Sequence, residues 1–356
     1  MPDLDIRFMA RALELAAMGE GLVSPNPLVG AVVVQDGRIV GEGFHQFALV
    51  RHAESYALEI AGGQARGATL YCNLEPCCHH GRTPPCTEAL IKAGISRVVV
   101  AAGDPDQRVN YRGLDQLAAA GIEVSVGLMA EEASKLNEIY LKHSVTGRPF
   151  IHLVSCVHPS AASMNGEGNR AAGIPFLWRP SRALQRLAHR YDALVLSDAS
   201  RASLAIAEEY VAPSRHRPPI IAGYTACVDG VRHGLGPDGL AGVCFVVLDD
   251  LSRQEEETLK PDSQGQGNAV CGGWVTPDGL IDALAGERVT SALVLASSID
   301  READLARVDK ITLVMDSKGA AAPEWPDIKG FAARSDEADL VESEGFVEIS
   351  RYPVRR

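Results

Sequence analysis

Four side chains suited to metal chemistry lie close together in the first third of this chain: His52, Glu54, Cys77 and Cys86. A catalytic zinc ion usually takes three protein ligands and leaves its fourth position to water. The imidazole of His52 and the thiolates of Cys77 and Cys86 fit that number of ligands. Each of the three begins or directly precedes a predicted helix, and the amino terminus of a helix favours thiolate over thiol. The pattern therefore predicts a zinc site and requires a fold that brings these segments together.

Glu54 lies two positions after His52 and is not needed as a metal ligand, so its carboxylate is free for another role. A bound zinc ion lowers the pKa of a water ligand to about 7. A neighbouring carboxylate then moves the proton to a ring nitrogen and on to departing ammonia. The sequence therefore predicts a zinc-dependent hydrolytic deaminase of an amino-pyrimidine or similar amino-heterocycle, with Glu54 as the catalytic residue.

Each part of this pattern is weak alone, because a histidine on a helix is usually an ordinary surface or core residue. The combination is specific: a Pro-Cys pair follows His-x-Glu after a predicted strand, and a second cysteine follows, as in the zinc nucleoside and base deaminases. That signature has two residues between its cysteines, whereas this chain has eight, residues 78–85. The insert contains two imidazoles and a guanidinium, which suit an anionic group on the substrate.

The composition excludes several classes of protein. Hydrophobic residues make up 46% and charged residues 22%, as in soluble globular proteins. No apolar run approaches the ~18 residues of a membrane span, and no secretory signal is visible, so we expect a cytoplasmic protein with no membrane partner. The net charge of -12 argues against a nucleic-acid partner, since phosphate binding needs clustered Lys and Arg.

Hydrophobic periodicity predicts two successive α/β series, with a boundary at Gly147-Arg148-Pro149. In the first series we expect helices at residues 5–19, 52–61, 87–93, 114–120 and 130–145, and strands at residues 28–34, 38–44, 68–73, 97–102 and 122–126. Asp36-Gly37 between two of these strands is a hairpin signal. This order predicts a three-layer α/β unit.

The second series predicts a second α/β domain with a mostly parallel sheet. Its expected strands are residues 150–156, 193–196, 219–222, 243–248, 292–295 and 311–315. Helices are expected near residues 181–189 and 278–284, and loops at 226–242 and 260–274.

Several stretches around the zinc pattern carry a resemblance to a known family. They are Pro25-Asn26-Pro27-Leu28-Val29-Gly30, Gly41-Glu42-Gly43-Phe44-His45-Gln46, His52-Ala53-Glu54, Gly67-Ala68-Thr69-Leu70-Tyr71, the block 74–86, Asp104-Pro105 and Ala120-Gly121-Ile122-Glu123-Val124. Through them residues 1–145 resemble the deaminase domain of the bifunctional riboflavin-biosynthesis deaminase/reductase family. The thirteen-residue block 74–86 separates this family from cytidine and adenosine deaminases.

The resemblance implies a cytidine-deaminase-like three-layer α/β/α domain at residues 1–146 and a dihydrofolate-reductase-like α/β domain at 147–356. It implies Zn2+ as cofactor and the substrate 2,5-diamino-6-ribosylamino-4(3H)-pyrimidinone 5′-phosphate, which would lose its 2-amino group as ammonia. Five residues would hold the pyrimidine and the ribose phosphate: Asn26, His45, His79, Arg82 and Asp104. Two alternatives stay open at this point: Asn26 as a turn residue between prolines, and His45 as an ordinary histidine at a strand end.

The first domain departs from the family pattern outside the metal ligands. Leu49 and Arg51 stand where the family has Gly and Pro, Asp106 where it usually has Asn, and Tyr111 where it usually has Gly.

The second domain departs at the positions that serve NADPH reduction in the family. Val154 stands at the family's Lys, His158-Pro159-Ser160-Ala161 at its Ser-Leu-Asp-Gly turn, and Ala296-Ser297-Ser298 at its Glu-Gly-Gly turn; its Asp-Pro-x-Leu-Thr segment is missing after Ser197-Asp198. Glycine is needed where backbone must approach a cofactor's phosphates. We therefore expect no NADPH-binding residues and an inactive reductase half, retained as a scaffold for a homodimer.

Three functions follow from these observations. The first is a monofunctional zinc deaminase of a phosphoribosylaminopyrimidine, in riboflavin synthesis or a related specialised pathway. The second is an intact bifunctional deaminase and NADPH-dependent reductase. The third is a non-catalytic zinc protein that binds a pyrimidine nucleotide. Glu54 favours an enzyme, because a structural zinc site has no use for it.

Overall fold

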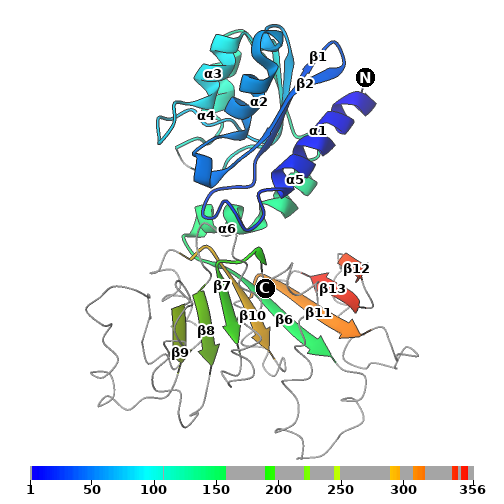
Figure 1. The fold of residues 1–356 in the computed structure, drawn as a ribbon, viewed down its shortest axis with the longest axis vertical. Helices are drawn as coiled ribbons and strands as arrows, with labels where there is room; N and C mark the ends of the chain where they lie inside the picture. Colours follow the sequence, from blue (N-terminus) through cyan, green and yellow to red (C-terminus); the bar gives the residue numbers. More distant parts are fainter. Residues whose placement is uncertain are drawn as a thin grey trace, which may run out of the picture. The chain divides into compact units, whose positions relative to one another are not determined.

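The computed structural model describes residues 2–106, 108–157, 189–196, 220–224, 244–248, 289–296, 308–316, 339–343 and 346–351 (Figure 1). The chain divides into two compact units, the first at Met1–Gly147 and the second beginning at Arg148. Several expectations lie outside the described residues: most of the helix at 181–189, the helix at 278–284, the loops at 226–242 and 260–274, and positions 158–161, 197–198, 297 and 298.

The first unit is built on a five-stranded sheet of order β2-β1-β3-β4-β5. Its strands are β1 (Gly30–Gln35), β2 (Arg38–Phe44), β3 (Thr69–Leu74), β4 (Arg97–Ala102) and β5 (Glu123–Val126). β1 pairs antiparallel with β2 and β3, while β3, β4 and β5 run parallel. Asp36 and Gly37 join β1 to β2 with φ angles of 50° and 71°, as the preferred two-residue hairpin turn requires.

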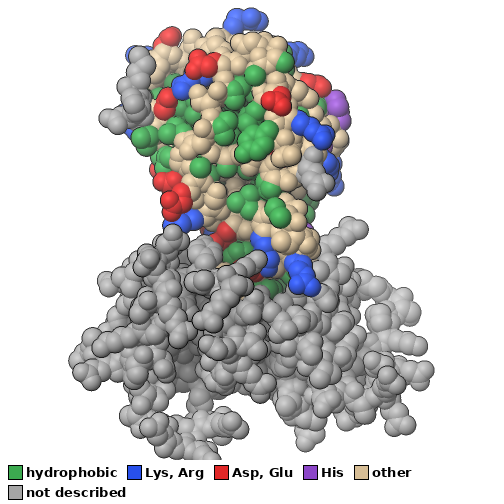
Figure 2. All heavy atoms as spheres, turned by 180° about the vertical axis from the view of Figure 1, so that it is seen from behind, with side chains coloured by type: hydrophobic (Ala, Val, Ile, Leu, Met, Phe, Trp, Pro, Cys, Tyr) green, Lys and Arg blue, Asp and Glu red, His purple; other side chains and the backbone are tan. Residues whose placement is uncertain are grey.

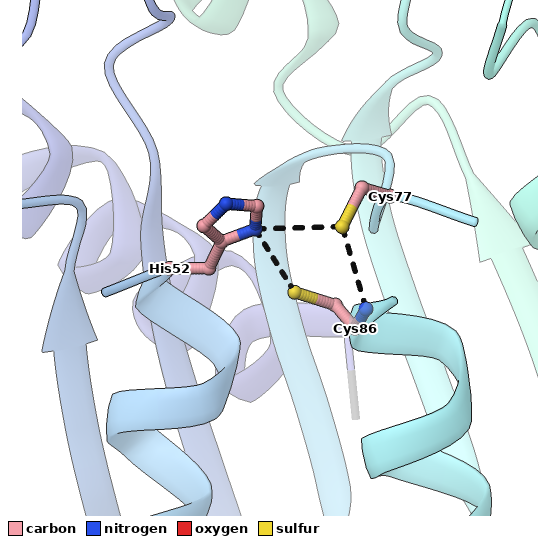
Figure 3. A group of neighbouring side chains, drawn as sticks. All are labelled: His52, Cys77 and Cys86. Atoms are coloured by element: carbon pink, nitrogen blue, oxygen red, sulfur yellow. Dashed lines mark hydrogen bonds between the residues drawn. The ribbon is translucent and has the colours of Figure 1, made fainter. Parts of the chain in front are cut away.

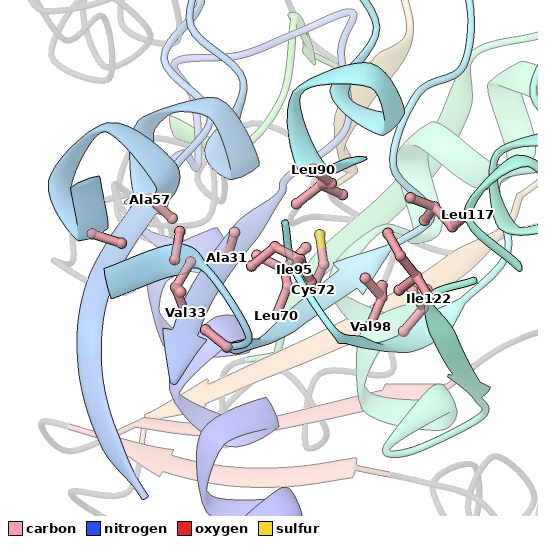
Figure 4. Close-up of a cluster of buried hydrophobic side chains, with 14 of the residues drawn as sticks. Ala31, Val33, Ala57, Leu70, Cys72, Leu90, Ile95, Val98, Leu117 and Ile122 are labelled. Carbon is pink, nitrogen blue, oxygen red and sulfur yellow. The ribbon is translucent and has the colours of Figure 1, made fainter. Parts of the chain in front are cut away.

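Helices cover both faces of this sheet: α1 (Pro2–Ala17), α2 (Ala53–Ala61), α3 (Cys86–Ala93), α4 (Arg112–Ala119), α5 (Ala130–Leu136) and α6 (Glu138–Thr146). Because strand side chains alternate between faces, β1 contributes to two separate cores. Ala31 and Val33 belong to the core that includes Ala57, Leu90 and Leu117 of α2, α3 and α4 (Figure 4). On the other face, Val32 and Val34 pack with residues of α1 and with Ala133 of α5. The unit is therefore the expected three-layer α/β sandwich.

Glycines in β2 allow α2 to approach the sheet closely. A Cβ at Gly41 would lie 2.1 Å from the carbonyl oxygen of Ala57, and one at Gly43 would lie 2.4 Å from that of Ala53. Both distances are too short for non-bonded atoms, so only glycine fits. This approach fixes the amino terminus of α2, where His52 and Glu54 lie.

Several elements of the first unit begin or end at other residues than the sequence predicts; α1, for example, runs from Pro2 to Ala17 rather than over residues 5–19. Two of these differences involve Asn137. The helix expected at 130–145 is two helices, because the chain breaks at Asn137, whose φ and ψ are -102° and 18°. The strand expected from residue 28 begins at Gly30. At Leu28 a side-chain amide takes the place of strand pairing, since Asn137 bonds to both backbone groups of that residue. The backbone of Asn137 itself keeps its hydrogen bonds to Ala133 and Leu141, so the break there lies in its φ and ψ angles.

The second unit contains an eight-stranded sheet of order β12-β13-β11-β6-β10-β7-β8-β9. Its strands are β6 (Phe150–Val157), β7 (Ala193–Leu196), β8 (Ile220–Tyr224), β9 (Cys244–Leu248), β10 (Ser291–Ala296), β11 (Lys310–Asp316), β12 (Asp339–Ser343) and β13 (Phe346–Arg351). From β11 to β9 all neighbours are parallel, and β13 pairs antiparallel with β11 and β12. The mostly parallel sheet agrees with the sequence expectation.

The surface of the first unit mixes apolar and charged side chains. On the face seen in Figure 2, hydrophobic side chains lie near the centre, with acidic and basic side chains interspersed towards its edges. Within the described ranges, no helix has both the length and the apolar character that a bilayer crossing demands.

Candidate active site

The three predicted metal ligands meet at the carboxyl end of β3. His52 is the residue before α2, Cys77 follows β3, and Cys86 is the first residue of α3. His52 Nδ1 lies 3.3 Å from Cys86 Sγ and 3.4 Å from Cys77 Sγ. The ligand atoms of all three residues lie within 4.8 Å of one another (Figure 3).

These separations fit a zinc ion. Zn–N and Zn–S bonds of ~2.0–2.3 Å at tetrahedral angles place the ligand atoms roughly 3.5–3.8 Å apart. The donor set of one imidazole and two thiols is one that zinc uses in catalytic sites. His52 Nε2 lies 3.4 Å from Thr83 Oγ1, so a ring that ligates through Nδ1 donates its other N–H to this hydroxyl.

The two cysteines share one negative charge. Hydrogen bonds from Cys86 and His52 lower the pKa of Cys77 to about 4. The hydrogen bond to Cys77, together with burial, raises the pKa of Cys86. The backbone N–H of Cys86 also donates to Cys77 Sγ over 3.3 Å. Cys77 is thus the thiolate in this arrangement, and ligation of a metal by both sulfurs releases a proton.

Glu54 lies in the first turn of α2 and is only 3% exposed. Burial raises the pKa of its carboxyl to about 7, and the negative charge of Cys77 adds to that effect. The side chains of His52 and Cys86 act on the same carboxyl and lower its pKa. All three candidate ligands therefore act electrostatically on Glu54, and its catalytic role stays a prediction.

Two of the predicted substrate residues form a hydrogen-bonded chain beside His52. His45 Nδ1 lies 2.7 Å from the carbonyl oxygen of Arg51, which only accepts, so Nδ1 carries the proton. His45 Nε2 therefore accepts from Asn26 Nδ2 over 3.0 Å. This bond orients the amide of Asn26 so that its Oδ1 is the atom left to accept from a ligand. The rings of His45 and His52 meet edge to face with centroids 5.5 Å apart.

Asp104 follows β4 and is 8% exposed. Its Oδ1 accepts from the hydroxyl of Tyr140 over 2.8 Å and from the backbone N–H of Asp106 over 2.9 Å. Burial raises the pKa of Asp104, and these two hydrogen bonds oppose that effect. Asp104 is thus held as a buried acceptor rather than as a solvated charge.

His79 and Arg82 lie in the loop between the two cysteines. The Nδ1 atom of His79 is buried without a hydrogen-bond partner among the described residues. The guanidinium of Arg82 lies over the ring of Phe47, 5.6 Å from its centroid. Phe47 follows His45 closely in sequence, so this contact joins the loop to the segment that carries His45.

Sequence reasoning assigned no role to Glu75, whose carboxylate connects the backbone segments around the site. Its carboxylate is 4% exposed and accepts from the backbone N–H groups of Asp104, Tyr111 and Gly113 over 3.2, 2.9 and 2.9 Å. Glu75 thereby fastens the segment after β4 to the segment that carries Cys77. The sequence offered one indication that Glu75 belongs to the site, namely its position directly before Pro76-Cys77.

Tyr111 occupies a backbone conformation that favours glycine, with φ of 66°. Its ring lies over Gly103, where a Cβ would approach Tyr111 Cζ to 2.7 Å. A side chain with a Cβ rarely adopts this conformation, so Tyr111 occupies a position where glycine would be unstrained.

Comparison with known proteins agrees with this geometry. Residues 2–102 match the cytidine and deoxycytidylate deaminase zinc-binding region. The chain is 53% identical over 169 residues to riboflavin biosynthesis protein RibD of Escherichia coli, covering 48% of this chain and 45% of that protein. It is 49% identical over 162 residues to the chloroplastic riboflavin biosynthesis protein PYRD of Zea mays, covering 46% and 40%. These matches span about half the length, or less, of the curated relatives.

Two solved structures are similar over nearly the whole chain. The deaminase/reductase of Thermotoga maritima is 26% identical, with a TM-score of 0.74 and 99% of both chains covered. RibD of Acinetobacter baumannii is 27% identical, with a TM-score of 0.71, covering 99% of this chain and 100% of that one. The first unit is therefore similar to the deaminase zinc-binding region and to the matched parts of riboflavin biosynthesis proteins, and the chain has the fold of the two solved deaminase/reductase structures along nearly its whole length.

Proposed function

We propose that the chain hydrolytically deaminates 2,5-diamino-6-ribosylamino-4(3H)-pyrimidinone 5′-phosphate and releases its 2-amino group as ammonia. One observation carries the reaction type: the ligand atoms of His52, Cys77 and Cys86 lie within 4.8 Å of one another, with the buried Glu54 beside them. The substrate rests on the family resemblance of residues 74–86 and on the riboflavin pathway named for the relatives.

In this proposal each residue of the centre has a distinct role. Zinc, when held by His52, Cys77 and Cys86, supplies a water molecule of lowered pKa. Glu54 would take one proton from the attacking water and pass it to the pyrimidine ring nitrogen as the oxygen bonds to C2. It would then take the second proton from that oxygen and pass it to the amino group, so that the C–N bond breaks and ammonia leaves. The burial of Glu54 keeps bulk water away from the proton that it carries.

Five further residues would bind the substrate. Asn26 offers its Oδ1 to an amino group, since His45 already accepts one of its N–H groups. Asp104 offers a second acceptor for a ring-edge donor. Arg82 suits the phosphate, because a guanidinium makes paired hydrogen bonds to phosphate oxygens, and His79 lies three positions before it in the same loop.

We further propose that residues 1–146 form the deaminase domain and residues 147–356 a dihydrofolate-reductase-like domain without reductase activity. The mostly parallel sheet and the likeness to two solved relatives over 99% of the chain support the fold. Val154 supports the loss of activity: it is fully buried in β6, where the family carries a Lys. The second domain would then serve as the contact of a homodimer.

An ammonia assay on zinc-loaded protein tests the proposal. The phosphorylated pyrimidine should release ammonia, and the unphosphorylated form should be a poorer substrate. Fully metallated protein that releases no ammonia would contradict the proposal. If that protein were nevertheless stabilised by the pyrimidine, it would be a non-catalytic binding protein. Oxidation of added NADPH would instead identify an intact bifunctional enzyme.

A further inference from the structure

One short segment at the junction of α5 and α6 contacts both loops that carry the proposed pyrimidine-binding residues. Asn137 ends α5, and Tyr140 lies in the first turn of α6. The first loop contains Asn26 and leads into β1, and the second contains Asp104 and follows β4. Neither Asn137 nor Tyr140 falls within residues 2–102, which match the zinc-binding region.

Asn137 fixes the first loop through the backbone of Leu28. Its Oδ1 accepts from the N–H of Leu28 over 2.8 Å, and its Nδ2 donates to the carbonyl oxygen of Leu28 over 2.9 Å. Asn137 is 3% exposed, so water does not compete for these bonds. Asn73 of β3 donates to the same carbonyl over 2.9 Å. The peptide groups of Leu28, two residues after Asn26, are therefore held from two sides.

Tyr140 fixes the second loop through a side chain. Its hydroxyl donates to Asp104 Oδ1 over 2.8 Å, and the backbone N–H of Asp106 donates to the same oxygen. The negative charges of Asp106 and Glu75 oppose the ionisation of Asp104, whereas the positive charge of Arg108 favours it. Arg108 faces the carboxylate of Asp106 and forms an ion pair with it. The hydroxyl of Tyr140 therefore supports the ionised form of Asp104 against its acidic neighbours.

We propose that Asn137 and Tyr140 are positioning residues that hold Asn26 and Asp104 in the geometry that binds the pyrimidine ring. This proposal rests on the proposed function for its substrate. It assigns the α5–α6 junction a role in recognition, because loss of either contact frees one binding loop while the metal ligands stay in place. The metal ligands are attached to α2, β3 and α3 instead.

Kinetics of Tyr140→Phe provide the first test, because this change removes only the hydroxyl. Loss of a hydrogen bond to a charged acceptor should raise KM about 10-fold, with kcat and zinc content within about 2-fold of wild type. The pKa of Asp104 should rise, so the acid limb of kcat/KM should move to higher pH. Tyr71→Phe is the matched control: it also removes a tyrosine hydroxyl that donates to an aspartate, Asp5, on the α1 face of the sheet.

Asn137→Ala and the milder Asn137→Asp test the other contact. The Asp variant keeps an acceptor for the N–H of Leu28 but cannot donate to its carbonyl, so its KM should lie between those of wild type and Asn137→Ala. Hydrogen exchange gives a readout that needs no substrate: the Leu28 amide should exchange at least ~10-fold faster in Asn137→Ala and unchanged in Tyr71→Phe.

Two outcomes would overturn the proposal. One is a Tyr140→Phe enzyme with wild-type KM and pH profile, and the other is a KM rise that Tyr71→Phe reproduces. If the wild-type protein releases no ammonia, the proposed function fails by itself. The positioning contacts are then judged by Leu28 exchange and by the pKa of Asp104 from carboxyl NMR, and they fail if neither responds to its variant.

Discussion

The carboxyl of Glu54 is the group whose removal should separate chemistry from metal binding. Glu54→Gln keeps the size of the side chain but cannot accept or release a proton. Loss of this proton transfer should lower kcat at least ~100-fold, while the zinc content stays at about one ion per chain. Ammonia release and metal analysis on the same sample measure both. Substantial turnover by the variant would show that another group carries the proton.

Arg82 provides the corresponding test of phosphate recognition. In Arg82→Ala the KM of the phosphorylated pyrimidine should rise about 10- to 100-fold, since hydrogen bonds to charged groups contribute about 1.5–3 kcal/mol. The KM of the unphosphorylated form should change little. Arg66→Ala is a suitable control, because Arg66 is exposed and precedes the opposite end of β3. Equal effects on both substrates would exclude a phosphate contact.

Residue type and spacing were sufficient to predict that His52, Cys77 and Cys86 come together, because few chemistries require that set; the role of Glu54 stays a prediction. They were not sufficient for Glu75, Asn137 and Tyr140. Glu75 bonds to backbone groups, which are present at every position and leave no pattern. Asn137 reaches Leu28, 109 residues earlier, and Tyr140 reaches Asp104, 36 residues earlier. Such partners become visible only when the fold places them together.

At the scale of elements, the close packing of α2 on β2 makes Gly41 a sensitive position. Gly41→Ala would place a Cβ 2.1 Å from a backbone oxygen of α2. Displacement of the helix should lower the free energy of unfolding by about 1–3 kcal/mol or more, and should weaken zinc binding through His52. Urea unfolding measures the first effect. Gly63→Ala, with no atom within 4 Å of the added Cβ, should leave stability almost unchanged.

The ion pair that attaches α1 to the sheet should make the free energy of unfolding depend on pH in the acidic range. A hydrogen-bonded ion pair with Arg97 lowers the pKa of Asp5 in the folded protein. A depressed folded-state pKa contributes stability above the unfolded value of about 3.9, and that contribution is lost as the pH falls through the folded pKa. Wild type should therefore be more stable than Asp5→Asn at neutral pH, and the difference should vanish in acid. A constant difference across pH titrations of unfolding would contradict this.

Hydrophobic periodicity predicted the layers well because it reports which face of each element is buried. Val32 and Val34 alternate with Ala31 and Val33, and the two sets lie in different cores. The same signal missed the break at Asn137, because residues on both sides of it keep a helical pattern. Periodicity contains no information on one residue whose φ and ψ leave the helical range while its backbone hydrogen bonds persist.

At the scale of the whole molecule, the two halves should differ in activity. Zinc-loaded protein should release ammonia from the diaminopyrimidine without oxidising NADPH when the deaminated product accumulates. The physical reason is the loss of a cationic side chain at Val154 and of the two glycines of the family's Glu-Gly-Gly turn, where this chain has Ala296-Ser297-Ser298. NADPH absorbance, with an active reductase as positive control, measures this. Oxidation at a rate similar to deamination would overturn the expectation of an inactive second half.

The two ends of the loop from Cys77 to Cys86 lie side by side and are joined by hydrogen bonds. The N–H of Cys86 bonds to Cys77 Sγ, and the N–H of Thr87 bonds to the carbonyl oxygen of Cys77. Because the loop is closed at its base in this way, changes in its middle should leave the two sulfurs together, provided that Thr83, which bonds to the ring of His52, is kept. Substitutions in the loop can accordingly change which substrate is bound without changing the two cysteines that would ligate the metal.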